Sequence, residues 1–146
     1  MQFETLPQKE CYERVAPWVN ELFGGSVLRK PDVPILGVMH GSAFAQVGVF
    51  PWAGDAIITT RAYVVTGAEV TPDLLRFLLR ENAGMHFGAF GLDDDGDIIF
   101  EHSIVGSTCD QKELEASVVA VVRTADDYDD QIVERWGGQR ALDQIR

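Results

Sequence analysis

The sequence predicts an α+β fold whose three helices and five strands follow the order α-βββ-α-ββ-α. Three observations lead to this prediction. Apolar residues recur at helical spacing in three segments, three short β-branched runs are separated by turn residues, and a glycine turn divides a further apolar segment into a hairpin. No repeat, low-complexity block or linker divides the 146 residues. A chain of this length suits one domain, which we expect to span residues 1–146.

The first helix is expected over residues 7–23. Its apolar residues recur every four positions from Cys11 to Phe23 and form one stripe. Pro17 lies inside the stripe and has no backbone N–H to donate, so we expect a kink or a split there. The glycine that follows, Gly24, ends the helix because it enters the left-handed conformation at low steric cost.

Three strands are expected over residues 35–39, 44–50 and 57–65. Each run is rich in β-branched or aromatic residues and is bounded by turn residues. The connections between them are short, so the strands should form an antiparallel meander. Gln46 and Arg61 interrupt two of the runs and are expected to face solvent.

A second helix should start at Thr71-Pro72-Asp73 and end near Gly84. The threonine hydroxyl can cap the first turn, proline suits the first helical position, and the aspartate lies near the positive end of the helix dipole.

Residues 86–104 are expected to form a hairpin around Asp94, Asp95 and Gly96. With Gly96 in the left-handed conformation, this three-residue loop sets Asp93 opposite Asp97. A two-residue turn would place a charged residue on the apolar face, so the three-residue loop is favoured. In the favoured register the inward face carries His86, Phe90, Leu92, Ile98, Phe100 and Ile104.

The third helix should be the longest. Asp110 and Glu113 resemble a capping box at its start, and apolar residues alternate steps of four and three up to Trp136. Such a helix is about 40 Å long, more than a small sheet easily covers. Tyr128, Ile132 and Trp136 then need another surface, so we predict a homodimer that uses this helix or a sheet edge beside it. The alternative is that the first helix covers this half within one chain.

The formal net charge of −11 comes from 23 acidic and 12 basic side chains. Nucleic-acid binding depends on releasing counterions to Lys and Arg, and no basic stripe is present, so DNA and RNA are excluded as main partners. The same charge disfavours anionic membrane surfaces, and the apolar runs are too short to span a bilayer. No signal peptide is readable, which makes the cytoplasm the expected location. Cys11 and Cys109 fit that location as unpaired thiols.

The densest acidic feature is the segment 93–97, with four aspartates around Gly96. Carboxylates at a glycine turn could hold a hard cation such as calcium. An EF-hand loop with Gly96 sixth would need carboxylates where Gly91 and His102 stand, so that motif fails. A tight turn explains the same residues. We therefore expect no metal and no cofactor, and a small-ligand or metal-sensing regulator using this turn remains the alternative function.

A second acidic run flanks Tyr128 on the third helix. Such a run is either the solvated side of an amphipathic helix or a site for a cation or a basic peptide. Acids in the last turns oppose the helix dipole, which hints at a basic partner such as a protein segment. The candidate partner-binding residues are Tyr128, Ile132, Trp136, Asp126, Asp127, Asp129 and Asp130.

No catalytic constellation is apparent. His86 and His102 share the inward face of the hairpin, but neither His40 nor any cysteine supplies a further zinc ligand there. No phosphate-binding loop is present. The possible nucleophiles, Ser42, Ser103, Ser107 and Cys109, lie in no nucleophile motif. The sequence thus indicates a binding module rather than an enzyme.

Three segments carry a family resemblance: LLRFLLREN at 74–82, FGAFGLDDDGD at 87–97 and DDYDD at 126–130. In this order they resemble the YbjN family of bacterial proteins, also described as type III secretion chaperone-like. The resemblance covers residues 71–128 clearly. It implies a five-stranded antiparallel sheet with helices packed on it, frequently in a dimer. It also implies a non-enzymatic protein-binding, chaperone-like or regulatory role with no catalytic residues to carry over.

Overall fold

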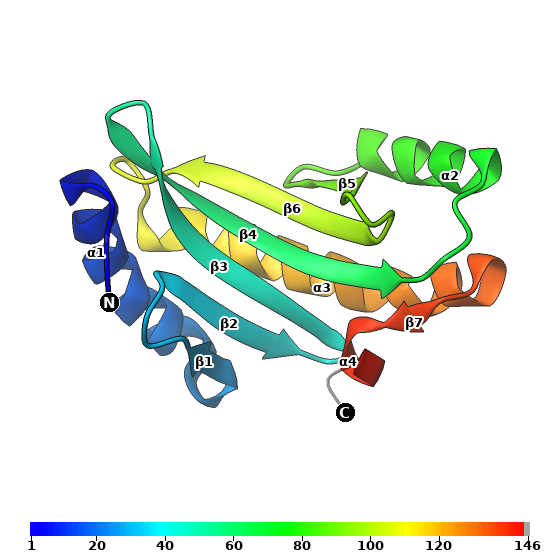
Figure 1. Cartoon of the computed structure of the whole chain (residues 1–146), viewed down its shortest axis with the longest axis horizontal. Helices are drawn as coiled ribbons and strands as arrows, with labels where there is room; N and C mark the ends of the chain where they lie inside the picture. The colour runs from blue at the N-terminus through cyan, green and yellow to red at the C-terminus, as the bar shows by residue number, and fades with distance from the viewer. Residues whose placement is uncertain (145–146) are drawn as a thin grey trace.

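The computed structural model describes residues 1–144 and contains one antiparallel sheet with helices at its face and ends (Figure 1). The helices are α1 (Leu6–Phe23), the 3-10 turn η1 (Gly24–Ser26), α2 (Pro72–Ala83), α3 (Gln111–Trp136) and α4 (Ala141–Gln144). The strands are β1 (Val27–Arg29), β2 (Ile35–His40), β3 (Ala43–Trp52), β4 (Asp55–Thr66), β5 (Ala89–Leu92), β6 (Ile98–Val105) and β7 (Gln139–Arg140).

The sheet has seven strands in the order β1-β2-β3-β4-β6-β5, with β7 paired to β4. The prediction of five strands was therefore wrong, and so was the element order that left out β1, β7 and α4. The missed strands have three and two residues, too few to show an alternation of apolar and polar side chains in the sequence. They are extended because β2 and β4 offer them backbone partners.

The meander and the hairpin are confirmed. β2, β3 and β4 pair in antiparallel succession. In the hairpin, Asp93 N–H donates to Asp97 O at 3.0 Å and Gly96, at φ +80°, donates to Asp93 O at 3.0 Å. Phe90 lies opposite Phe100, as the three-residue loop requires. The strand is shorter than expected, however, and His86 lies outside it.

The helices α2 and α3 start where the sequence predicts, and the predicted residues cap their first turns. Thr71 Oγ1 accepts the N–H of Leu74 at 3.2 Å, and Asp110 Oδ1 accepts the N–H of Glu113 at 2.7 Å. In α1 the helix continues through Pro17 rather than splitting there.

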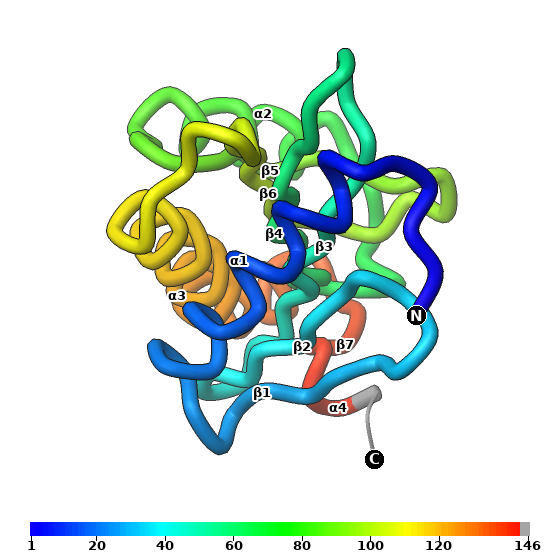
Figure 2. The backbone as a smooth tube through the Cα atoms, turned by 90° about the vertical axis from the view of Figure 1, so that its left-hand side faces the viewer, coloured from blue at the N-terminus to red at the C-terminus, as the bar shows by residue number. Residues whose placement is uncertain are grey.

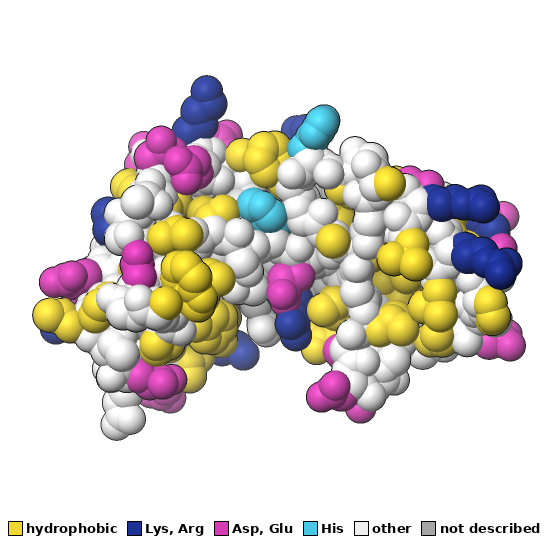
Figure 3. All heavy atoms as spheres, turned by 90° about the horizontal axis from the view of Figure 1, so that it is seen from above, with side chains coloured by type: hydrophobic (Ala, Val, Ile, Leu, Met, Phe, Trp, Pro, Cys, Tyr) yellow, Lys and Arg dark blue, Asp and Glu magenta, His cyan; other side chains and the backbone are white. Residues whose placement is uncertain are grey.

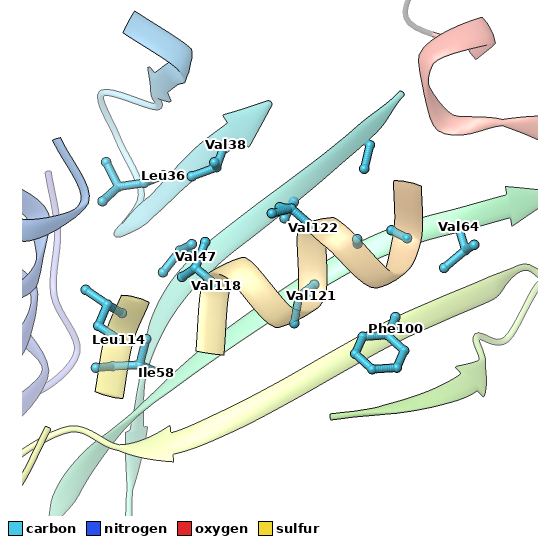
Figure 4. Close-up of a cluster of buried hydrophobic side chains, with 14 of the residues drawn as sticks. Leu36, Val38, Val47, Ile58, Val64, Phe100, Leu114, Val118, Val121 and Val122 are labelled. Atoms are coloured by element: carbon cyan, nitrogen blue, oxygen red, sulfur yellow. The ribbon is translucent and has the colours of Figure 1, made fainter. Parts of the chain in front are cut away.

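The helices α1 and α3 pack on one face of the sheet, and α3 runs across β4, β6, β3 and β2 (Figures 1 and 2). Its apolar side chains interdigitate with those of the strands beneath it. Figure 4 shows this core, with Leu114, Val118, Val121 and Val122 of the helix above Leu36, Val38, Val47, Ile58, Val64 and Phe100 of the sheet. The alternation of strand side chains therefore fixes which face is the core face.

The distal half of α3 is covered by α2. The Phe77 ring of α2 lies 6.2 Å from the Tyr128 ring and 5.2 Å from the Trp136 ring, centre to centre. Ile132 is fully buried, and Trp136 is nearly so. The argument that these residues need a second copy of the chain was therefore wrong, because Ile132 and Trp136 are buried within one chain and α2 supplies Phe77 against Tyr128 and Trp136. This cover does not come from α1, which the sequence offered as the alternative.

Among residues 1–144, no helix combines the length and the apolar character needed to cross a bilayer.

Candidate functional site

The opposite face of the sheet is mostly uncovered, and we call it the open face. Figure 2 shows α3 on one side of the strands and no helix of similar length on the other. The short α4 contacts β3 and β4 at one end. The open face carries the side chains that alternate with the core residues of the strands: Ile35, Met39, Phe44, Gln46, Phe50, Ile57, Thr59, Arg61, Tyr63, Glu101, Ser103 and Val105.

A hollow of about 330 Å³ lies at the middle of the open face. Arg61 and Glu101 stand directly opposite each other on β4 and β6 and form an ion pair beside it. Gln46 faces Arg61 from β3, so both residues lie on the solvent side as predicted. Figure 3 views the molecule from above, across the edge of the sheet, and shows exposed apolar side chains in two groups with an acidic and a basic side chain between them.

Two glycines shape the floor of the open face. A Cβ atom at Gly37 would stand 2.7 Å from the ring of Phe44, and one at Gly48 would stand 2.6 Å from the ring of Phe50. These distances are far below van der Waals contact, so each ring lies down over a glycine. The missing side chains thus leave room for the Cε2 and Cζ atoms of two aromatic rings, which add apolar surface to this face.

Large apolar side chains are exposed along the strands β3 and β4 of this face. Phe50 and Trp52 are 40% and 50% exposed near the β3–β4 turn, and Tyr63 is 39% exposed toward the other end. Exposed apolar side chains grouped on one face mark interaction sites more often than isolated ones do.

Beside Tyr63, a second hollow of about 380 Å³ meets the acidic turn. Phe44 and Tyr63 line it on one side, and Asp93, Asp95 and Asp97 line it on the other. One carboxylate oxygen from each aspartate lies within 4.8 Å of the others. Two of these carboxylates already accept backbone hydrogen bonds. Asp93 accepts the N–H groups of Asp95 and Asp97, and the Asp97 carboxylate accepts the N–H of Gly67.

The candidate residues on α3 do not form a single exposed surface. Ile132 and Trp136 belong to the core, so they cannot contact a partner without unfolding the end of the helix. Tyr128 is half-buried and donates its hydroxyl to Glu81 of α2 at 2.5 Å. Burial and this carboxylate raise the pKa of Tyr128 to about 12.

The four aspartates of this run also have different positions. Asp126 and Asp129 hold Ser42 in the β2–β3 turn, and Asp129 is buried. Asp130 pairs with Arg140 of β7 at 3.3 Å, and Asp127 is exposed. Arg140 of the chain itself is thus a basic partner for Asp130, and a basic partner from outside the chain stays a prediction.

His86, which precedes the hairpin, and His102 of β6 line one hollow of about 470 Å³ between β6 and the start of α3, together with Phe87. His102 Nδ1 lies 2.7 Å from Ser117 Oγ, and burial lowers the pKa of His102. Sequence reasoning missed this serine, because Ser117 lies in no motif and is not one of the apolar positions that define the inward stripe of the helix. Ser117 is only 1% exposed, so its hydroxyl serves to orient the imidazole and is out of reach of a substrate.

The other possible nucleophiles are engaged elsewhere. Ser42 contacts the two aspartates of α3, Ser103 lies 2.9 Å from Thr59, and Ser107 contacts Asp55. Cys109 is buried, and desolvation raises its pKa to about 11, which keeps the thiol protonated. Within residues 1–144, none of these four groups hydrogen-bonds to a histidine.

A family model covers nearly the whole chain. Residues 9–144 match the model of TY-Chap1, described as T3SS (YopN, CesT) and YbjN peptide-binding chaperone 1. The chain belongs to this family. The resemblance drawn from the sequence is thereby confirmed, and it extends well beyond residues 71–128.

Solved structures share the fold at low sequence identity. The ExsC–ExsE complex matches with a TM-score of 0.63 and 15% identity over 86% of this chain and 95% of that one. The HopA1–SchA chaperone–effector complex matches with a TM-score of 0.61 and 8% identity over 86% and 99%. YbjN from E. coli matches with a TM-score of 0.53 and 14% identity over 82% and 92%. No curated protein matches in sequence.

Proposed function

We propose that this TY-Chap1 protein binds a segment of another protein on its open face and acts as a small chaperone or adaptor. The observation that carries the proposal is the exposure of Phe50, Trp52 and Tyr63 on a sheet face that no long helix of residues 1–144 covers, with Phe50 lining the central hollow. The family description, peptide-binding chaperone, supports the same class of partner. Two of the similar folds were solved as complexes of two named proteins, one of them described as a chaperone with its effector.

The chemistry of the face suits an apolar segment with basic residues at one end. Apolar side chains of such a segment would lie against the rings of Phe50 and Tyr63. A basic side chain would approach Asp93, Asp95 and Asp97 beside Tyr63, where carboxylate and ring both favour a cation. The net charge of −11 would speed the encounter with a basic partner at low salt.

This role needs no catalytic group, no cofactor and no metal, and we expect the protein to act in the cytoplasm. The buried serine and thiol described above suit a protein that binds without chemistry. We retain the homodimer as part of the proposal, although its contact must lie elsewhere than on Ile132 and Trp136.

The proposal is tested with a short fluorescent peptide of alternating leucine and threonine that ends in lysines, and a twin that ends in glutamates. Binding is measured by fluorescence anisotropy at low salt. We expect the lysine peptide to bind more tightly than its twin. Phe50→Asp should weaken this binding by about tenfold or more, the usual effect of losing one buried anchor.

Leu79→Asp is the matched control, because Leu79 is an exposed apolar residue on α2, away from the open face. It should leave the affinity unchanged, and circular dichroism should show both variants folded. Equal losses in the two variants would move the site off the open face. No binding of either peptide to the wild-type protein would count against the proposed function.

A further inference from the structure

The β2–β3 turn is held to α3 through one serine. Ser42 donates its backbone N–H to Asp126 Oδ1 at 2.7 Å, and its Oγ lies 2.6 Å from the same oxygen. The hydroxyl is also in hydrogen-bond contact with Asp129 Oδ2. The preceding Gly41 has φ +57°, and a side chain there would collide with the Asp126 carboxylate. The turn therefore lies directly against these two acids.

The hydrogens in this cluster do not suffice if both acids are ionised. A serine hydroxyl has one proton and can donate to one acceptor, whereas an ionised carboxylate only accepts. Ser42 Oγ contacts an oxygen of Asp126 and an oxygen of Asp129 at once. One of these contacts would then bring two oxygens together with no proton between them. A proton on one of the acids removes the conflict.

The surroundings decide which acid carries the proton. Asp126 accepts a backbone N–H as well as the hydroxyl, and an anion is favoured by such donors. Asp129 is 1% exposed, and its second oxygen, Oδ1, is buried without a partner in the part of the chain that the structure describes. A buried carboxyl group with an unpartnered oxygen is far cheaper to hold as a neutral acid than as an anion.

We propose that Asp129 is a carboxylic acid in the folded protein and donates to Ser42 Oγ, while Ser42 donates its own proton to ionised Asp126. The hydrogen bonds that link Asp129, Ser42 and Asp126 then hold the β2–β3 turn to α3 only while Asp129 keeps its proton. When Asp129 ionises, the Asp129–Ser42 contact loses its proton and two anions face one hydroxyl. The cluster is thus a pH-sensitive latch built into the fold.

The charged groups around the latch are His40 of β2, Asp130 of α3 and Arg140 of β7. Arg140 is already paired with Asp130 at 3.3 Å and with Asp143 at 3.1 Å. The hydroxyl and backbone N–H of Ser42 lower the pKa of Asp126, with smaller help from His40 and Arg140. Desolvation raises the pKa of Asp129 and outweighs the hydrogen bonds from Ser42 and from the Asp130 backbone, which lower it; the charges of Asp130 and Asp126 add to the rise. We therefore expect the pKa of Asp126 to lie below the ordinary aspartate value and the pKa of Asp129 to lie above it.

The sign of the pH effect follows from this raised pKa. Below the ordinary aspartate pKa, about 3.9, Asp129 is protonated both folded and unfolded, so the latch contributes its full stability. As the pH rises further, the unfolded chain loses this proton first and unfolding is favoured. Each further pH unit raises the unfolding constant about tenfold, until the folded Asp129 ionises as well.

The first test is a ¹³C NMR titration of the aspartate carboxyl groups in the wild-type protein. The exposed Asp127, on the same helix, is the internal reference. We expect the midpoint of Asp129 above that of Asp127 and the midpoint of Asp126 below it. A midpoint of Asp129 at or below that of Asp127 would overturn the proposal.

The second test compares urea unfolding of the wild type with D129N, whose amide can donate to Ser42 as the neutral acid does. The two unfolding constants should agree within about twofold near pH 4 and diverge by about tenfold per pH unit above it until folded Asp129 ionises, with D129N the more stable. D127N, the matched control, should show no such divergence. A ratio of wild type to D129N that stays constant with pH would contradict the latch. If D129N does not fold, the NMR titration alone decides.

Discussion

The side-chain amide of Asn82 completes the hydrogen bonding of Phe90 at the outer edge of the sheet. Phe90 N–H donates to Asn82 Oδ1 at 2.7 Å, and Asn82 Nδ2 donates to Phe90 O at 3.2 Å. One side chain of α2 thus takes the place of a neighbouring strand beside β5. Unpaired strand edges invite pairing with other chains, and this contact blocks one of the two ends of the sheet.

We predict that Asn82→Asp destabilises the protein by about 1–3 kcal/mol, since the carboxylate cannot donate to Phe90 O and faces it as an unpaired acceptor. Urea unfolding gives the free energy, and the amide hydrogen of Phe90 should exchange faster. Asn20→Asp is the matched control, because Asn20 donates only to the carbonyl of Ala16 one turn earlier in α1. A loss at Asn82 no larger than the loss at Asn20 would contradict the edge role.

Gly96→Ala should destabilise by about 1 kcal/mol or more, because φ is +80° in the hairpin loop and a side chain is strained there. Thermal or urea unfolding measures the change. Gly25→Ala is the control, since no atom lies within 4 Å of a Cβ built at Gly25 and its φ is outside the left-handed region. A neutral Gly96→Ala variant would show that the loop geometry is not required.

We predict that the turn 93–97 binds calcium, magnesium and zinc more weakly than about 10 µM, the weak end of the range of EF-hand sensors. Asp93 already accepts two backbone N–H groups, and these bonds hold its carboxylate in the turn. Calorimetric titration of each ion checks the prediction. A tighter, stoichiometric site lost in Asp95→Asn would instead support a metal-sensing role.

The homodimer remains a prediction, with a sheet edge as its contact. Light scattering at micromolar concentration should give twice the 16.1 kDa of one chain. The free edge is β1, where Leu28 is exposed, so Leu28→Lys should dissociate the dimer with the fold retained. Ile132→Asp should unfold the chain instead, because it places a charge in the core. A mass of one chain for the wild type would refute the dimer.

Both thiols should react slowly with Ellman's reagent in the folded protein at pH 8. Burial raises the pKa of Cys11 and raises that of Cys109 to about 11, and the thiolate is the reactive form. Unfolding in urea should make both react at once. Prompt reaction of either thiol in the native protein would mean that its site opens readily.

Local signals in the sequence determined much of this protein. Thr71 and Asp110 cap their helices through bonds that reach only three residues ahead. Gly96 determined the register of the β5–β6 hairpin. Of the two loop lengths considered, only the three-residue loop keeps the apolar residues of both strands on one face. The alternation along β3 and β4 likewise placed Gln46 and Arg61 on the face that proved open. Each of these features depends on neighbours in the chain.

Only the tertiary structure decided which surfaces are free. Trp136 is covered because Phe77, on another helix, reaches it, and no spacing along α3 indicates that contact. The sequence predicted that Asp129 is either solvated or in contact with a partner, yet it is buried against Ser42, 87 positions away. The strands β1 and β7 are too short to be stable alone and are extended only because β2 and β4 pair with them. Pairings between distant residues leave no periodic trace in a sequence, which is why the candidate site moved from α3 to the open face of the sheet.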